Sequence, residues 1–226
     1  MVDTTFGDMQ ARIADEMQRS DLSSQIIGKI QQAVSEYEQD RFVFNEQVFS
    51  MNTVLGTEYY PLSTSLLDIS GNPLPVGADG SLTELLEIDN MTVLVTFQPY
   101  NVFPKTMAWI DARQPPAAIY TGIPYFYCIF NEQVRLYPIP NNVYGMKLDV
   151  LVRFPNLVNP ADTNPWTRDG KHLIRAHAKL LVYRDVLRDV GSAQLAEIER
   201  DDALTSLESK ADKKLASGKL DAWGYT

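Results

Sequence analysis

The sequence KHLIRAHAKLLVYRDVLRDV at residues 171–190 carries the clearest periodic pattern in the chain. Its apolar residues recur at steps of three and four, at Leu173, Ala176, Leu180, Tyr183, Leu187 and Val190. This spacing places them on one face of a helix, as in helices that pack lengthwise against a neighbour. Pro165 before the stretch and Gly191 after it stand where helices commonly begin and end. The pattern therefore predicts a helix with one buried face.

Further helices are predicted at both ends of the chain. A last helix should follow a cap at Ser192 and end at Gly218, with its apolar residues at Leu195, Ile198, Leu204, Leu207, Ala211 and Leu215. At the other end, Thr5 and Asp8 have the spacing of a capping box. The first helical face after that box comprises Phe6, Met9, Ile13 and Met17. After a break at Ser20-Asp21, a second face comprises Leu22, Ile26, Ile30, Val34 and Tyr37, in a helix running to about Arg41. The two ends of the chain should supply the helices of one bundle.

The middle of the chain changes to the pattern of strands. Strands are predicted near 42–44, 48–51, 86–95, 125–130, 133–137 and 144–154. Turn residues occur at 72–80, at Asp89-Asn90 and at Asn131-Glu132, and one short helix is expected over Pro104–Arg113. We expect a small antiparallel sheet or barrel of about five or six strands. The fold class predicted is α+β, a helical bundle from the N- and C-terminal helices with a central antiparallel β-rich insert.

These patterns divide the chain into four predicted segments. They are an N-terminal helical hairpin (1–46), a β-rich insert domain (47–163), C-terminal helices packing with the hairpin (164–218), and an extended tail (219–226). The tail is too short to form a core, yet it contains Leu220, Trp223 and Tyr225. Large aromatic residues in such an end are typical of an arm that becomes ordered on a partner. The alternative is an end that folds back or frays.

Composition excludes several classes of protein. The 226 residues carry a formal charge of −9, with an estimated pI of about 4.7, which disfavours a nonspecific nucleic-acid coat. The start of the chain shows no secretory signal pattern, and no apolar run approaches the length of a membrane span. Cys128, the one cysteine, cannot form an internal disulfide. We expect a soluble acidic protein of a reducing compartment.

Residues for catalysis or metal binding are not evident. His172 and His177 are five positions apart, so on a helix they do not share a face, and His177 is interpreted as a packing residue. Cys128 lies in a predicted strand and is interpreted as a buried, inert thiol. The sequence contains no nucleophile elbow, zincin, phosphate-loop or dinucleotide pattern. We expect no enzyme activity, no cofactor and no metal.

A row of basic residues is the other candidate site. Arg168, Lys171, Arg175 and Lys179 recur at steps of three and four along one predicted helix. They could form a docking stripe for an acidic partner or nucleic acid. The alternative is an ordinary solvated face whose long side chains cover apolar neighbours.

The order of these segments resembles the head-to-tail adaptor (tail accessory or connector) proteins of short-tailed bacteriophages. The opening Thr5–Met9 with Arg19–Leu22 and Gln25-Ile26 is similar to the family's first helices. Ile30–Asn45 resembles its second helix running into a strand. Its paired strands have counterparts in Gly122–Tyr127, Val134–Pro140 and Tyr144–Leu148, and its third helix in Asn164-Pro-Trp166 with the periodic helix that follows.

The resemblance implies a structural protein of the virion, located at its neck or tail and assembled in the bacterial host cytoplasm. Family members form a ring, of twelve subunits, beneath the portal protein, extend the DNA channel and attach the tail nozzle or fibres. Genomic DNA would pass without specific binding, and no membrane is a partner. The tail residues Leu220, Trp223 and Tyr225 would dock on the portal. The implied role is head-tail joining and DNA ejection.

Two other classes of function stay open on the sequence alone. The first is a ligand- or carbohydrate-binding tail component that uses the aromatic residues around Tyr120–Tyr127. However, Tyr125, Phe126 and Tyr127 are consecutive, so they should straddle both faces of a packed strand. The second is a cell-wall hydrolase, which would need two convergent carboxylates in a cleft.

Overall fold

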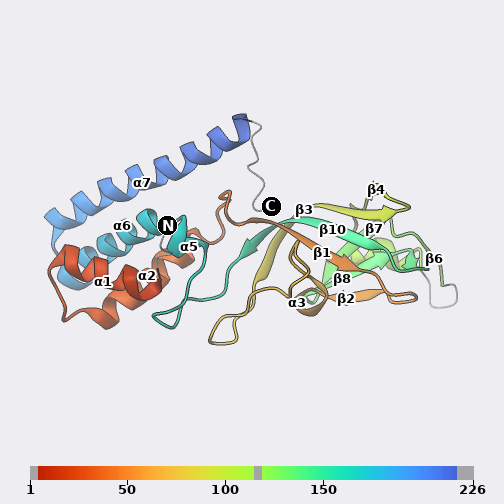
Figure 1. Ribbon diagram of the computed structural model, residues 1–226, viewed down its shortest axis with the longest axis horizontal. Helices are drawn as coiled ribbons and strands as arrows, with labels where there is room; N and C mark the ends of the chain where they lie inside the picture. The colour runs from red at the N-terminus through yellow and green to blue at the C-terminus, as the bar shows by residue number, and fades with distance from the viewer. Residues whose placement is uncertain (1–4, 115–118, 218–226) are drawn as a thin grey trace. The chain divides into compact units, whose positions relative to one another are not determined.

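The computed structural model describes residues 5–114 and 119–217, with side chains of the last helix described as far as Lys210. The chain divides into two compact units (Figure 1). The first, here the helical unit, comprises residues 1–45, 77–81 and 154–226, and the second, the β unit, comprises 46–76 and 82–153. Helices and largely antiparallel sheets together confirm the α+β class. Among the described residues, no helix is both long and apolar enough to cross a membrane.

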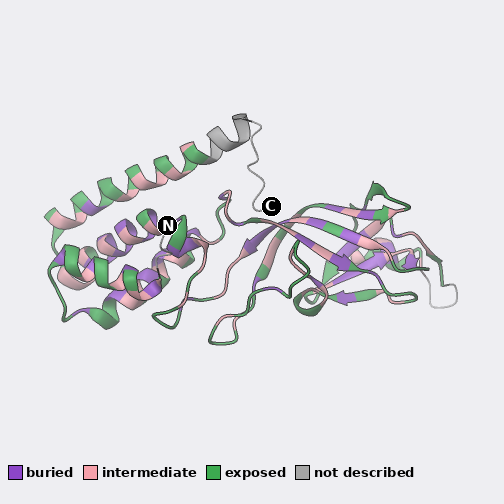
Figure 2. Ribbon diagram, in the orientation of Figure 1, coloured by how far each residue is buried: buried purple, intermediate pink, exposed green. Residues whose placement is uncertain are grey.

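The helical unit has one core that joins both ends of the chain. Its elements are α1 (Phe6–Met17), α2 (Ser23–Tyr37), α5 (Pro165–Arg168), α6 (Lys171–Leu181), a π-helix η1 (Val182–Leu187) and α7 (Val190–Ser217). The inward faces of α1, α2 and α6 appear in purple in Figure 2. The largest fully buried side chains of the unit include Phe6, Met9, Ile13, Ile26, Ile30 and Trp166. The predicted capping box is confirmed, because Thr5 and Asp8 bond each other's backbone N–H.

The periodic stretch at 171–190 is helical, but its last turn departs from the prediction. Leu173, Ala176 and Leu180 are buried as expected. From Val182 the helix widens into the π-helix, which shifts the phase of the side chains. Arg188 then takes a left-handed backbone conformation (φ 53°) and ends the helix. Val190, predicted to be interior, is consequently 70% exposed at the start of α7.

The last helix differs from the prediction at its start and in its buried face. Asp189, not Ser192, caps it, since the Asp189 carboxylate accepts bonds from the backbone N–H and hydroxyl of Ser192. The face toward the rest of the unit consists of Ala196, Ala203, Leu204 and Leu207. Leu195 and Ile198 were predicted to share the apolar face, but they are 67% and 59% exposed.

The segment after α2 is a turn rather than the strand predicted at 42–44. Helix α2 ends at Tyr37, short of the expected Arg41. The Asn45 side chain accepts a hydrogen bond from Phe42 N (2.7 Å) and donates one to the Asp40 carbonyl (2.7 Å), which closes the turn. Phe42 and Phe44 stack on each other, and both rings meet Trp166 edge-on. Side-chain hydrogen bonds and aromatic packing therefore override the local preference for a strand.

The β unit has two four-stranded sheets. The first runs in the order β1 (Glu46–Asn52), β10 (Gly145–Arg153), β3 (Glu84–Val95) and β4 (Gln98–Asn101), all antiparallel. The second runs β2 (Tyr59–Pro61), β8 (Gln133–Tyr137), β7 (Phe126–Phe130) and β5 (Phe103–Pro104). The remaining elements are β6 (Thr121–Gly122), β9 (Ile139–Pro140), α3 (Leu62–Ser65) and α4 (Met107–Asp111). Its fully buried side chains include Met51, Val93, Val134, Leu136, Met146 and Leu148.

Three predictions for this unit are wrong in detail. Instead of a small antiparallel sheet or barrel of about five or six strands, there are two four-stranded sheets and a two-stranded one, and β5 joins β7 in parallel. The helix expected over Pro104–Arg113 shortens to α4, because Pro104 pairs in β5 and Thr106 caps the helix at Trp109 N. No turn forms at Asp89-Asn90: β3 continues through an irregular register, and the chain turns at Thr96-Phe97.

Candidate docking surface on the helical unit

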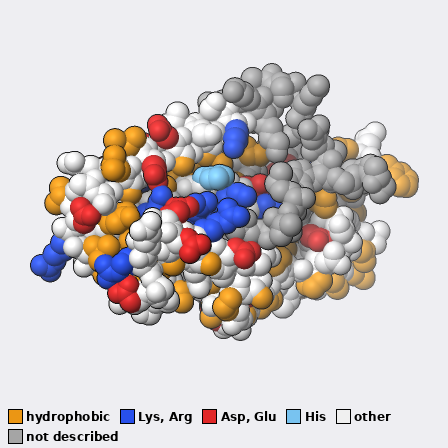
Figure 3. Space-filling model, turned by 60° about the vertical axis from the view of Figure 1, so that its left-hand side comes forward, with side chains coloured by type: hydrophobic (Ala, Val, Ile, Leu, Met, Phe, Trp, Pro, Cys, Tyr) orange, Lys and Arg blue, Asp and Glu red, His pale blue; other side chains and the backbone are white. Residues whose placement is uncertain are grey.

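Basic side chains from three helices gather on one side of the helical unit. Lys171, His172 and Arg175 come from α6, Arg12 from α1 and Lys210 from α7. Burial, and then the nearby charges of Lys171, Lys210 and Arg12, lower the pKa of His172. Figure 3 shows blue Lys and Arg side chains clustered on this face, with acidic side chains among and around them. The cluster spans helices that are far apart in the sequence.

Two residues of the predicted basic stripe form ion pairs inside the helical unit. Glu16 on α1 forms ion pairs with both Arg175 and Lys179, the latter at 3.0 Å. Lys179 also contacts Glu199 of α7 at 2.5 Å. The side chains of Arg175 and Lys179 are only 15% and 13% exposed, and burial lowers the pKa of Arg175. These two cations therefore connect α1, α6 and α7, rather than face a partner.

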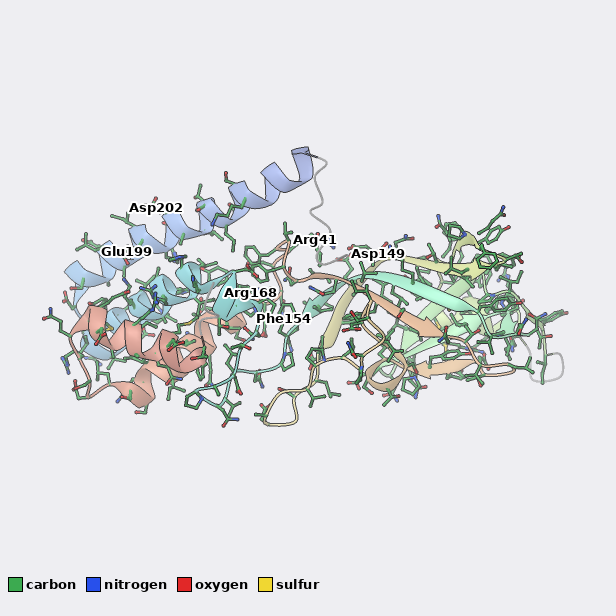
Figure 4. The ribbon with its side chains drawn as sticks, viewed as in Figure 1. Arg41, Asp149, Phe154, Arg168, Glu199 and Asp202 are labelled. Carbon is green, nitrogen blue, oxygen red and sulfur yellow. The ribbon has the colours of Figure 1, made fainter. Side chains whose placement is uncertain are left out.

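The other two residues of the stripe are more accessible. Arg168 belongs to the short helix α5 and pairs with the adjacent Asp169 at 2.9 Å. Figure 4 labels Arg168 on α5, and Glu199 and Asp202 on α7. Lys171 is the first residue of α6 and is half-buried. The outward-facing positive group thus consists of Lys171 with Arg12 and Lys210, two residues that reasoning along one helix missed. Only the packing of three helices brings them together.

The predicted tail residues Leu220, Trp223 and Tyr225 lie outside the described residues.

His177 is a packing residue, as interpreted from the sequence. Its side chain is buried and meets the Tyr37 ring edge-on, with ring centroids 5.2 Å apart. Its Nε2 lies 3.2 Å from the Glu36 carboxylate, and burial lowers its pKa. Across the described residues, no three His, Cys, Asp or Glu side chains gather as a metal site would require. Cys128 is buried, and burial raises the pKa of its thiol.

The aromatic residues on and beside the second sheet of the β unit form two groups: Phe126 and Tyr137 pack with Trp109, whereas Tyr59, Phe103, Tyr125 and Phe130 are exposed. Phe126 lies on the face that α4 covers, and the next residue, Tyr127, is buried on the opposite face of β7, so the consecutive aromatics straddle the two faces as predicted. Tyr125, just before the strand, is 44% exposed. Phe126 packs on Trp109 of α4, with the centroids 4.8 Å apart. The Arg113 guanidinium lies 3.7 Å from the Trp109 ring centre. A sugar ring needs an open aromatic face, and the described contacts of Trp109 already use its ring.

The second sheet also carries a buried cation that fixes α4. Arg135 on β8 is 5% exposed and pairs with Glu58 at 2.5 Å and with Asp111 of α4. Register places Arg135 opposite Cys128 and Tyr137 opposite Phe126, so these side chains share the face that α4 covers. The ion pairs hold α4 on this face, which explains why the Trp109 cluster is closed.

The sequence matches a known protein family. No curated protein matches the sequence. The family model described as SU10 adaptor protein matches residues 4–220, which includes both units and nearly the whole chain. The chain therefore belongs to the SU10 adaptor protein family, a family of structural phage components.

Proposed function

We propose that this chain is a head-tail adaptor that forms a ring under the portal, extends the DNA channel and attaches the tail nozzle or fibres. The observation that carries the proposal is the family match across residues 4–220. The partners proposed are the portal protein, a tail nozzle or fibre protein, and further copies of this chain, twelve in the ring. The role is structural, in the neck of a virion assembled in the host cytoplasm.

The charge of the chain supports a channel that DNA crosses without specific binding. Acidic residues outnumber basic ones in both units, 20 to 15 in the helical unit and nine to five in the β unit. A ring multiplies this net negative charge, and a negative lumen repels phosphate and lets DNA slide. No catalytic step and no membrane contact belong to this proposal.

We assign the parts of the chain as the sequence divides them. The hairpin 1–46 and the helices 164–218 form the body at the portal, and the insert 47–163 faces the tail side or the outside. The tail 219–226 docks on the portal through Leu220, Trp223 and Tyr225. The basic surface contributes to docking on a partner through Lys171, Arg12 and Lys210, because Arg175 and Lys179 already pair with Glu16. The carbohydrate-binding alternative has less support: Tyr120 and Tyr125 are exposed, but Tyr127 is buried and the Trp109 ring is already covered by Phe126 and Arg113.

Native mass spectrometry tests the ring. We expect the purified chain to be mostly monomeric at micromolar concentration and to form a ring of defined copy number when mixed with a purified portal ring. A chain that forms no ring after mixing with the portal would contradict the adaptor proposal. A stable dodecamer without the portal would contradict only the order of assembly.

Deletion of residues 219–226 tests the docking arm. We expect the shortened protein to keep its melting temperature and lose its co-sedimentation with DNA-filled heads, since aromatic anchors often dominate an interface. A lower melting temperature would indicate that the tail folds back on its own helices. Unchanged co-sedimentation would remove the tail from the interface.

A further inference from the structure

One end of the β unit exposes apolar side chains from four separate connections. In the first sheet, Asn52, Gly145 and Leu94 lie in one row across β1, β10 and β3. Adjacent strands are about 4.8 Å apart, so Asn52 and Leu94 are separated by about 10 Å. The β1–β2 loop, the segment before β10 and the β3–β4 turn therefore emerge at the same end of the sheet (Figure 1).

We define the apolar end by six side chains, each more than half exposed. Three come from the connections of the first sheet and are strongly exposed, Val54 (56%), Leu55 (66%) and Val143 (63%). Phe97 at the β3–β4 turn is 99% exposed. Ile119 and Tyr120 complete the set at 72% and 54%. Contiguous exposed apolar surface in a folded protein marks an interaction site more often than chance placement.

Hydrogen bonds fix these connections in place. The buried Tyr60 hydroxyl accepts from Val54 N (3.0 Å) and donates within the same loop. Thr53 exchanges bonds with the segment before β10, through its backbone N to the Tyr144 carbonyl (2.9 Å) and its hydroxyl to the Asn142 carbonyl (3.0 Å). Backbone bonds from Gly56 to Pro140 and from Ile139 to Tyr120 tie in the remaining connection. The backbone of these connections is thus ordered by hydrogen bonds, while their apolar side chains remain exposed to solvent.

The turn at the tip of β3–β4 has a conformation that its residues disfavour. Thr96 and Phe97 both have positive φ, 50° and 68°. Two-residue hairpins with this geometry prefer Asn-Gly, and a β-branched residue there is a genuine outlier. The other hairpin turn of the unit uses Asn131 and Glu132, of which Asn tolerates the conformation well. Local strain of this kind concentrates at functional positions, and here it presents a phenyl ring to solvent.

The stretches of sequence that carry these six side chains contain no charged residue. Residues 47–57, 90–104, 119–131 and 136–146 contain no Asp, Glu, Lys, Arg or His, in a chain that is 22% charged. Exposed strand edges and loops usually carry charges that prevent association. Without cations, this surface cannot attract anionic lipid head groups or release counterions from nucleic acid. An uncharged apolar surface on another protein is the partner that its chemistry fits.

A second copy of the chain fits this surface poorly. Two copies meeting through the apolar end would pair about a two-fold axis, which closes a dimer rather than a ring. A ring would need a different surface to receive it. One candidate is the exposed apolar pair on α7, Leu195 and Ile198. This pair is bordered by Glu197, Glu199 and Asp202, and burying their carboxylates against an uncharged surface costs free energy.

We propose that the apolar end of the β unit is the docking site for a different protein of the virion, which presents an uncharged apolar surface to Phe97 and Leu55. This inference rests on the proposed adaptor function and names the surface through which the next component attaches. Phe97 supplies the anchor, since large aromatic side chains at the centre of an interface contribute most of its binding energy.

The test compares particles of the phage that encodes the chain, assembled with wild-type or substituted protein. The docking variant is Leu55→Ser with Phe97→Asn, and Asn relieves the turn conformation, so the fold is preserved. The matched control is Ile69→Ser with Val76→Ser, two side chains of the β unit that are 59% and 60% exposed outside the apolar end. Each protein is checked by melting temperature, and particle composition is read by mass spectrometry.

We expect docking-variant particles to retain the chain, to lack another structural protein, and to be at least tenfold less infectious than control particles. Complete particles with normal infectivity would overturn the proposal. So would flotation of the wild-type chain, but not the variant, with phosphatidylcholine or phosphatidylglycerol vesicles, or a wild-type dimer that the variant abolishes. Absence of the wild-type chain from particles would instead reject the adaptor function itself.

Discussion

The helical unit and the β unit stabilise themselves by different means. The helical unit carries 35 of the chain's 49 charged residues, and several of them pair across helices, as Glu16 does with Arg175 and Lys179. The β unit carries few charges, leaves large apolar side chains exposed at one end and places Phe97 in a strained turn. Charged side chains that pair within the unit are already satisfied in the monomer, whereas an exposed apolar surface is removed from water only when a partner covers it. Many charges of the helical unit are thus already paired within it, whereas the β unit carries the apolar end that we propose as the docking site for a further component.

The largest expected effect comes from a charge placed inside the helical unit. Leu180 on α6 is 5% exposed, so Leu180→Asp buries an unpaired carboxylate and should lower the free energy of unfolding by about 3 kcal/mol or more. Urea denaturation followed by helical circular dichroism measures the loss. The control is Leu195→Asp, the same substitution at a site that is 67% exposed, which should change stability little. Equal effects at the two sites would contradict the assignment of the buried face.

The next effect tests whether the ion pairs of Glu16 are structural. Glu16→Gln leaves the poorly exposed Arg175 without its carboxylate, and we expect a loss of about 1–2 kcal/mol in the free energy of unfolding. Asp21→Asn removes a pair with Arg19 in which both side chains are well exposed, and it serves as the control with no measurable loss. An unchanged free energy of unfolding in Glu16→Gln would contradict this structural role, and would assign Arg175 and Lys179 to the docking stripe again.

A stabilising change is expected in the β unit. Replacing Thr96-Phe97 by Asn-Gly supplies the residues that the turn conformation favours and should raise the free energy of unfolding by about 1 kcal/mol. Glu132→Gly at the other hairpin should give a smaller gain, because Asn131 already suits its position. Thermal unfolding of both variants decides this. Destabilisation by Asn-Gly would show that Phe97 packs within the chain and is no anchor.

The smallest expected effect is a pH dependence of the helical unit. Burial lowers the pKa of His177, against the attraction of Glu36 and with the help of Arg200 and Arg184. The unfolded chain therefore takes up the proton first as pH falls, so stability declines from about pH 7.5 toward pH 5.5. His172 shifts in the same direction, so both histidines contribute. Melting temperatures of His177→Phe and His172→Asn should each show a weaker slope than the wild type, and an unchanged slope in both would contradict the assignment.

The periodic segments could be predicted from sequence because their signal is local. The one-sided apolar spacing of α1, α2 and α6 and the box at Thr5 and Asp8 require only neighbours within a few turns. The strands β7 and β8 and their turn at Asn131-Glu132 likewise follow from adjacent residues. The buried face of α7 could not be read in this way, because its apolar residues are spread around the helix and packing against α6 decides which of them are covered.

The candidate surfaces were less predictable because they depend on residues distant in sequence. The basic stripe was visible along one helix, but its neutralising partner Glu16 comes from α1, more than 150 positions away. A turn was predicted at Asp89-Asn90, whose residues have the usual turn chemistry, whereas the turn at Thr96-Phe97 was not predicted because its residues disfavour the conformation. The presence of Thr96 and Phe97 in a turn that favours Asn-Gly nevertheless points to a functional site, since conflicts between local preference and global fold occur mostly at such sites.

The way in which the core of the helical unit joins both ends of the chain has a consequence for synthesis on the ribosome. Helices α1 and α2 end at Tyr37, and their partner α6 begins only at Lys171. At about 5–20 residues per second, the first two helices wait on the order of 10 s for the surface that buries them. The β unit is translated in between and has its strands complete before α6 emerges. We expect folding to proceed from the middle of the chain outward, with the N-terminal apolar faces exposed to chaperones in the interval.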